Sequence, residues 1–230
     1  MKDTPIECVD SFNFLSIYID KQLYWKHHIN ALSSKMSRAV GVMNKLKFQL
    51  PVDAMLKMYN SLILCHLNYG ILAWGHKYSN LEALQKKAVR VVACAAYNAH
   101  TSPIFKFLRL LKISDIFVLA KLKFYHKYCN NQLPRYMQEM PIKQSNEIHS
   151  YNTRRAAQGK LYTPKANHVF AQNCVRHNII LTVNDLPQSL YEKVATHSLK
   201  GLATYFKTTC IENYEMICQK GPNCYVCHGI

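Results

Sequence analysis

A long stretch of apolar residues at helical spacing constrains the fold of this chain more than any other feature. Between Trp25 and Phe48 the apolar side chains recur every three or four residues, as on one buried face of an α-helix. They are Ile29, Leu32, Met36, Ala39, Val40, Met43 and Leu46. Between them lie the cations Lys26, Lys35, Arg38, Lys45 and Lys47. The pattern predicts an amphipathic helix whose other faces are basic.

Two further segments predict helices that pack against the first. Residues 54–72 are almost continuously apolar, which predicts a helix that is buried on most sides and central to a three-helix bundle. Residues 79–92 are amphipathic, and Ser79 and Glu82 have the spacing of a capping box. The residues expected in the core are Leu32, Met36, Met43, Tyr59, Leu62, Ile63, Tyr69, Leu84 and Val91.

A short β element precedes the first helix. The apolar, β-favouring residues here are Phe12, Phe14, Ile17 and Ile19. The parity of the apolar positions changes at Leu15 and Ser16, which predicts either a bulge or a hairpin bend. After this element the patterns favour helix almost throughout. The expected fold class is therefore mainly α, with a short β element at the N-terminus, a helical bundle and further helices.

The charge of the chain points to a polyanionic partner. Its 29 Lys and Arg outnumber 13 Asp and Glu, and the formal net charge is +16. Such an excess favours nucleic acid first and an anionic membrane surface second, and the alternative is a basic surface that is only solvated. No apolar run approaches the roughly 20 residues that a membrane span needs. We expect nucleic acid, and not a membrane, as the partner.

The cysteines suggest a reducing, intracellular location and include one weak candidate for a metal site. They number nine, an odd count that favours free thiols. Residues 1–7 have no apolar core, so no signal peptide is expected there. Cys224 and Cys227 have the spacing of a zinc knuckle, to which Cys218 and His228 could add ligands. The alternative is a cysteine-rich tail without metal, because a second ligand pair after a loop is missing.

A series of motifs follows one another along most of the chain. They are FNFLSIYID at 12–20 with LYWKHHI at 23–29, LP at 50–51 with LKMYNSLI at 56–63, HLNYG at 66–70 with WG at 74–75, LQKKAVR at 84–90, the set Tyr97, His100, Thr101 and Pro103, YNTR at 151–154, and NDLP at 184–187. In this order they resemble the C-terminal part of jockey-type non-LTR retrotransposon reverse transcriptases. Ser16 stands where that family has Gly, and Val183 where it has Trp.

The resemblance implies an organisation and a function. It implies the end of a palm with a primer grip at 1–24, a thumb-like three-helix bundle at 25–95, additional helices at 96–140, a polar linker at 141–166, and a C-terminal helical region with a cysteine-rich tail at 167–230. An intact member of the family is an RNA-directed DNA polymerase that uses Mg²⁺ on paired carboxylates. This sequence has no adjacent Asp pair. The chain alone is therefore expected to be inactive and to hold no cofactor.

The expected site is a contact surface for a primer–template duplex, without catalytic residues. It combines the grip turn with the basic helices: Phe14, Leu15, Ser16, Lys26, His28, Lys35, Arg38, Lys45, Lys47, Lys86, Lys87 and Arg90. The resemblance implies a location in the cytoplasm and nucleus if the parent element is active. Two alternatives stay open, namely a free-standing basic helical module that binds nucleic acid and the product of a decayed transposon reading frame.

Overall fold

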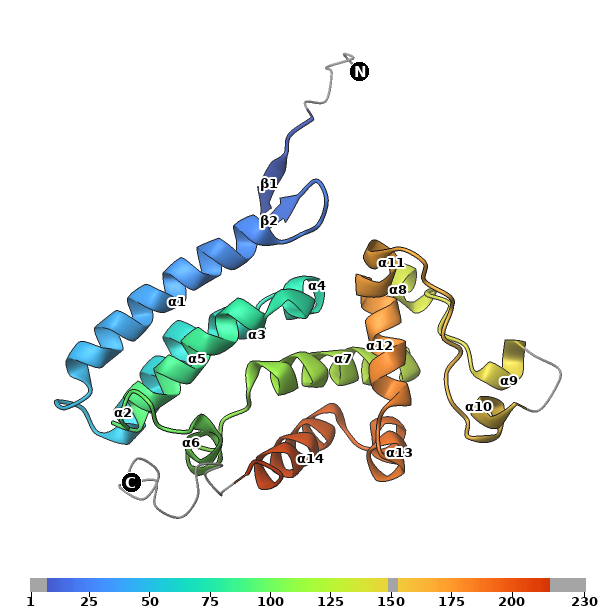
Figure 1. The fold of residues 1–230 in the computed structure, drawn as a ribbon. Helices are drawn as coiled ribbons and strands as arrows, with labels where there is room; N and C mark the ends of the chain where they lie inside the picture. Colours follow the sequence, from blue (N-terminus) through green and yellow to red (C-terminus); the bar gives the residue numbers. More distant parts are fainter. Residues whose placement is uncertain (1–7, 149–152, 216–230) are drawn as a thin grey trace. The chain divides into compact units, whose positions relative to one another are not determined.

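The computed structural model describes residues 8–148 and 153–215. It is mainly helical and begins with a two-stranded antiparallel sheet, which confirms the expected fold class (Figure 1). The described residues divide into two compact units. The first comprises 8–70 and 77–101, and the second comprises 71–76, 102–148 and 153–215.

The N-terminal β element is a hairpin. Strand β1 (Ser11–Phe14) pairs with β2 (Ile17–Asp20), and Phe14 lies opposite Ile17. The two residues that join the strands, Leu15 and Ser16, have φ of 47° and 65°. Positive φ at both central residues is what a two-residue type I′ turn requires. Of the two predicted alternatives, the hairpin bend is confirmed and the bulge is wrong.

Asp20 fixes the passage from the hairpin into helix α1 (Lys26–Leu46). Its Oδ1 accepts a hydrogen bond of 2.7 Å from the amide of Tyr24, and its Oδ2 accepts one of 2.6 Å from the amide of Trp25. Asp20 is buried. A carboxylate at the N-terminus of a helix accepts hydrogen bonds from free amides and interacts favourably with the positive end of the helix dipole. Asp20 therefore has a structural role, since it fixes the backbone at the start of α1.

Three helical segments make up the rest of the first unit. The predicted apolar face of α1 is confirmed in part, since Ile29, Leu32, Met36 and Met43 are buried. Ala39, Val40 and Leu46 are half-buried. The second segment runs through α2 (Val52–Tyr59), the π-helical η1 (Asn60–Leu64) and α3 (Cys65–Asn68). The third is α5 (Ser79–Val92), and α1 and α5 pack along each other.

The prediction of one helix over 54–72, buried on most sides, is wrong. The helix ends at Asn68, and Gly70 follows with φ of 62°. Only one line of this segment is fully buried, consisting of Met55, Tyr59, Ile63 and Leu67. Leu62 is 37% exposed and Tyr69 is 50% exposed. Apolar composition alone did not show that only one side of this helix would be buried against the other helices of the bundle.

The buried face of α5 also differs from the expected one. It consists of Leu81, Gln85, Ala88, Val89 and Val92. Leu84 and Val91 are only half-buried, so the expected core residues are not all buried together. Gln85 is buried because its Nε2 donates a hydrogen bond of 2.9 Å to the Tyr59 hydroxyl. This bond satisfies two polar groups inside the bundle.

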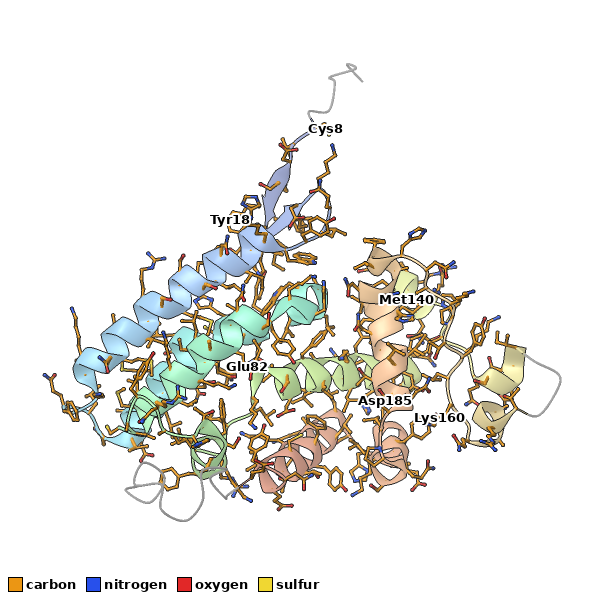
Figure 2. All side chains as sticks on the ribbon, viewed as in Figure 1. Cys8, Tyr18, Glu82, Met140, Lys160 and Asp185 are labelled. Atoms are coloured by element: carbon orange, nitrogen blue, oxygen red, sulfur yellow. The ribbon has the colours of Figure 1, made fainter. Side chains whose placement is uncertain are left out.

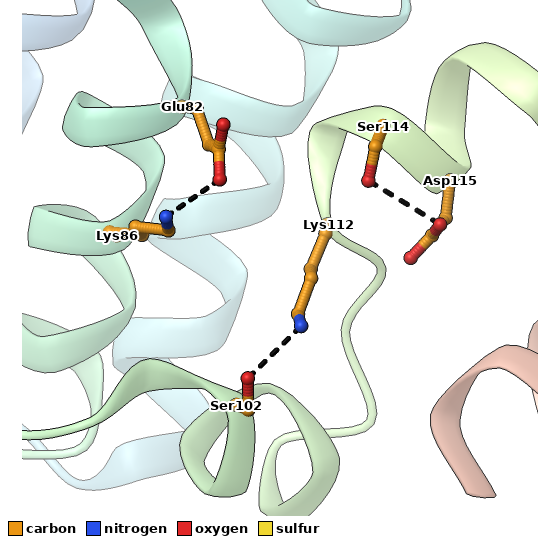
Figure 3. A network of polar contacts seen from close by, with 6 residues as sticks. All are labelled: Glu82, Lys86, Ser102, Lys112, Ser114 and Asp115. Atoms are coloured by element: carbon orange, nitrogen blue, oxygen red, sulfur yellow. Dashed lines mark hydrogen bonds and ion pairs between the residues drawn. The ribbon is translucent and has the colours of Figure 1, made fainter. Parts of the chain in front are cut away.

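The predicted capping box at the start of α5 is wrong. Ser79 is the first residue of the helix, and no side chain caps it. Glu82 instead forms an ion pair with Lys86, in which Oε1 and Nζ are 2.6 Å apart (Figure 3). The two residues are one helical turn apart, which is the favoured spacing for such a pair.

The second unit is a set of helices around α7. Its elements are α4 (Ile71–Trp74), η2 (Gly75–Lys77), α6 (Thr101–Phe107), α7 (Ile113–Cys129), α8 (Arg135–Gln138), α9 (Ser145–Ile148), α10 (Arg154–Ala157), α11 (Val169–Asn173), α12 (Val175–Asn184), α13 (Gln188–Thr196) and α14 (Leu199–Glu212). Helix α7 contacts α4, α12, α13 and α14. One apolar cluster fills the space between them and includes Leu122, Ile179, Val183, Val194 and Phe206.

Polar contacts also tie distant parts of the second unit together. The hydroxyl of Tyr214 bonds Asp115, and it accepts a hydrogen bond of 3.0 Å from the amide of Lys112. The Lys112 ammonium lies 3.0 Å from the hydroxyl of Ser102 (Figure 3). Among the described helices, none combines the length and the apolar composition that a bilayer crossing needs.

Candidate nucleic-acid interface

The predicted cations of α1 do not share one face of the helix. Arg38 and Lys45 are seven residues apart, so they lie on the same side, and both are exposed. Lys26 is also exposed, whereas Lys35 and Lys47 are half-buried. A phosphate backbone running along one side of α1 would therefore meet only some of these charges.

Lys35 belongs to a cluster with two histidines. Burial lowers the pKa of His28 and of His66, and the positive charge of Lys35 lowers both further. His28 is only 2% exposed, and its Nδ1 accepts a hydrogen bond of 3.5 Å from the amide of Tyr18 in the hairpin. The structure thus places His28 in the interior, where it joins hairpin to helix, and not on a surface that a duplex could reach.

A pocket of about 350 Å³ lies between α1 and α5. Its lining residues come from both helices and from the loop after α5: Ser37, Val40, Gly41, Asn44, Lys47, Leu84, Lys87, Arg90, Val91, Ala95 and Tyr97. Three of the predicted contact residues, Lys47, Lys87 and Arg90, meet here. Within the described part of the chain, the lining includes cations and no carboxylate. The pocket is therefore suited to an anionic ligand.

The apolar part of this pocket explains the misassigned face of α5. Leu84 and Val91 line the pocket together with Val40 of α1, which is why they are half-buried. Gly41 leaves further room, since a Cβ at this position would meet no atom within 4 Å. The pocket thus combines an apolar wall with basic side chains, and the polar side chains of Ser37 and Asn44 add hydrogen-bonding groups.

Two exposed aromatic side chains, Tyr97 in the pocket and Phe48 next to the lining residue Lys47, were not predicted as contact residues from the sequence. Phe48 is 83% exposed and Tyr97 is 81% exposed, the highest values among the large apolar side chains of the described residues. Tyr97 lines the pocket, and the ammonium of Lys47 lies 4.8 Å from the centre of the Phe48 ring. Aromatic rings beside cations are typical of surfaces that stack nucleobases. The alternation of basic and apolar residues from Lys45 to Phe48 was the available signal.

Arg90 holds the loop that presents Tyr97. Its Nε donates a hydrogen bond of 2.8 Å to the carbonyl of Ala99. Its own carbonyl accepts a bond of 2.9 Å from the amide of Ala95, so the helix ends in a Schellman motif with Cys94 in the left-handed conformation. Burial lowers the pKa of Arg90 and the nearby Tyr97 opposes this shift. Arg90 is thus a positioning residue as well as a charge.

Lys86, the remaining predicted cation of α5, is placed differently. Its ammonium pairs with Glu82 of the same helix (Figure 3). Figure 2 labels Glu82 among the side chains of the first unit. Because both partners are partly exposed, the pair adds little stability, but it neutralises charge next to the pocket. Lys86 is therefore a weaker candidate for a phosphate contact than Lys87.

The predicted grip residues lie away from the pocket. Phe14 and Leu15 are 56% and 70% exposed at the hairpin turn, and Ser16 is exposed beside them. The hairpin precedes α1 (Figure 1). The pocket is lined by residues in the C-terminal half of that helix, from Ser37 to Asn44. Since α1 has 21 residues, its ends are roughly 30 Å apart. The hairpin turn and the pocket are two separate surfaces of the first unit.

No metal centre is found in the described residues. Within 8–148 and 153–215, no group of three or more His, Cys, Asp or Glu side chains is arranged to hold an ion. The candidate ligands Cys218, Cys224, Cys227 and His228 lie outside the described residues.

Comparison of the chain with protein-family models, with curated proteins and with solved structures found no match.

Proposed function

We propose that the first unit binds nucleic acid through the basic surface of α1 and α5. Following the resemblance, we further propose that it acts as a thumb-like segment of a non-LTR retrotransposon RNA-directed DNA polymerase and holds the primer–template duplex. The pocket between α1 and α5 carries this proposal. It joins Lys47, Lys87 and Arg90 with the exposed ring of Tyr97, and its described lining has no carboxylate.

The charges support contact with a phosphate backbone. Each Lys or Arg that neutralises a phosphate releases counterions, which gives affinity that does not depend on sequence. The exposed Lys26, Arg38 and Lys45 extend the positive surface of α1 beyond the pocket. The role proposed is to hold nucleic acid and not to catalyse its synthesis.

The proposal includes an intracellular, reducing location, in the cytoplasm and nucleus. The cysteines of the described residues support it, because they are free thiols: Cys8, Cys65, Cys94, Cys129, Cys174 and Cys210. Free thiols of this kind persist in reducing compartments.

Binding of a labelled RNA–DNA duplex, measured by fluorescence anisotropy over a range of salt concentrations, tests the proposal. The double variant Lys47→Gln and Lys87→Gln should bind more weakly to every duplex sequence. The slope of log affinity against log salt should become shallower by about two, close to one for each lost phosphate contact.

The matched control removes two exposed cations from the second unit. Lys127→Gln with Lys200→Gln changes the net charge by the same amount, and both positions are exposed. This control should leave the salt slope near that of the parent chain. Equal losses in the two double variants would mean that net charge alone attracts the duplex and that the surface of α1 and α5 is no specific interface.

A further inference from the structure

We propose that the pocket between α1 and α5 holds a single unpaired nucleobase of a bound strand, stacked on Tyr97. Lys47 and Lys87 then contact the phosphates that flank this base. The inference rests on the proposed binding of nucleic acid and names the part of the ligand that enters the pocket.

The shape and lining of the pocket favour one base over a duplex backbone. Its volume of about 350 Å³ lies at the lower end of the range of ligand pockets, roughly 300–1,000 Å³. A backbone on the surface would meet the cations and leave the apolar wall of Val40, Leu84 and Val91 uncovered. A flat ring that enters the pocket covers this wall and removes apolar surface from water.

The aromatic side chain supplies the stacking surface. Tyr97 is 81% exposed although its loop is fixed by hydrogen bonds from Arg90 and Ala95. A rigid loop that presents an uncovered ring loses little conformational freedom when a base stacks on it. Stacking on an aromatic ring accepts any base, and Ser37 and Asn44 add groups that can bond base edges.

The charge around the pocket selects a base that carries phosphates. Lys47, Lys87 and Arg90 line the pocket, and the described lining has no carboxylate to compensate them. A neutral aromatic compound would leave these charges uncompensated. A nucleotide within a strand provides a ring for the apolar wall and phosphates on both sides of it.

Gly41 makes the pocket testable without a change of charge. It lies in the C-terminal half of α1, is exposed, and has open space within 4 Å of the point where a Cβ would stand. Gly41→Leu should therefore fill the pocket from its α1 side without disturbing the core. Gly41→Ala is the matched control, because one methyl group leaves most of the volume free. Tyr97→Ala removes the stacking surface, and Tyr97→Phe keeps it.

The experiment compares three ligands by anisotropy at one salt concentration: a blunt RNA–DNA duplex, the same duplex with an unpaired 3′ overhang, and that overhang with abasic sites. The parent chain should bind the overhang about tenfold more tightly than the other two ligands, the order of one stacked base. Gly41→Leu and Tyr97→Ala should bind all three equally. Gly41→Ala and Tyr97→Phe should keep the preference.

Each other outcome overturns the inference in a recognisable way. If Gly41→Leu and Tyr97→Ala keep the overhang preference, the pocket holds no base, while duplex binding and the proposed function stand. Two competitors are added at the same concentration of negative charges as the overhang. Complete displacement by adenosine monophosphate would make the pocket a site for free nucleotides, and complete displacement by polyglutamate would make it a site for acidic peptides. If no ligand binds the parent chain, the proposed function fails together with the inference.

Discussion

At the scale of single residues, the hairpin turn holds two side-chain-bearing residues in a conformation that favours glycine. Leu15 and Ser16 have φ of 47° and 65°. The left-handed conformation costs an L-residue roughly 1–2 kcal/mol. Glycine removes this cost but loses more freedom on folding, so Ser16→Gly should raise the free energy of unfolding by about 1 kcal/mol.

Urea unfolding and hydrogen exchange of the Tyr18 amide measure this effect. Ser11→Gly is the control, because Ser11 lies in the extended strand β1, where glycine only adds flexibility. It should lower the stability of the hairpin. A loss of stability in Ser16→Gly as large as that in Ser11→Gly would contradict the left-handed turn.

The cluster of Lys35, His28 and His66 predicts that stability depends on pH. Burial and the charge of Lys35 lower the pKa of both histidines from the ordinary 6.5. Below about pH 6.5 the unfolded chain therefore binds protons that the folded chain does not yet bind. The free energy of unfolding should fall as the pH decreases from 6.5 through the lowered values.

Urea midpoints at about pH 7.5 and 5.5, compared between variants, test this dependence. His28→Asn keeps an acceptor for the Tyr18 amide and should flatten it, and Lys35→Gln should flatten it in part. His27→Asn, at the exposed neighbouring position, is the control for the substitution itself. An unchanged fall in His28→Asn would show that His28 does not contribute to the pH dependence.

At the scale of elements, two neighbouring residues report which side of the 52–68 helix is covered. Ile63 is fully buried and Leu62 is 37% exposed. Ile63→Ala should cost about 2–5 kcal/mol, the range for emptying a packed core site. Leu62→Ala should cost less than about 1 kcal/mol, as substitutions outside the core usually do. Thermal unfolding of both variants is the measurement, and a larger loss in Leu62→Ala would reverse the assigned face.

The helices show where spacing predicts burial and where it does not. In α1 the apolar residues are separated by polar ones, so only one face could be buried, and the structure confirms it. Residues 54–72 are almost continuously apolar, so composition could not show that Ile63 is buried while Leu62 is partly exposed. In α5, buried Gln85 pairs with Tyr59 and apolar Leu84 lines a pocket, which no rule of apolar spacing predicts.

At the scale of the whole molecule, composition predicted a basic surface but not how its charges are grouped. Lys47, Lys87 and Arg90 are far apart in sequence and meet only because α1 and α5 pack along each other. His28, by contrast, accepts a hydrogen bond from Tyr18 of the hairpin, and the charge of Lys35 acts on His28 and His66. Neither His28 nor Lys35 lines the pocket. The sequence showed Tyr97 only as part of a motif. Its exposed position beside the pocket depends on a loop that Arg90 fixes by a hydrogen bond, and the sequence does not show this bond.

The acidic residues of the whole chain bear on catalysis. Polymerases of the proposed class need two metal ions on adjacent carboxylates, and this sequence has no adjacent Asp pair. Asp20, the acidic residue at the end of the hairpin, is buried and accepts two backbone hydrogen bonds at the start of α1. The described residues also form no cluster able to hold an ion. We therefore expect the purified chain to bind a primed RNA template without extending the primer.

The measurement is incorporation of labelled deoxynucleotides with Mg²⁺ or Mn²⁺, compared with a mock purification and with an active reverse transcriptase on the same template. Binding of the template is measured in the same tubes, so that a lack of synthesis is not confused with a lack of contact. Incorporation above the mock level that disappears in Asp20→Asn would assign Asp20 a catalytic part. The two backbone hydrogen bonds that Asp20 accepts would then not be its only role. The proposal that this chain binds nucleic acid without synthesising it would be wrong.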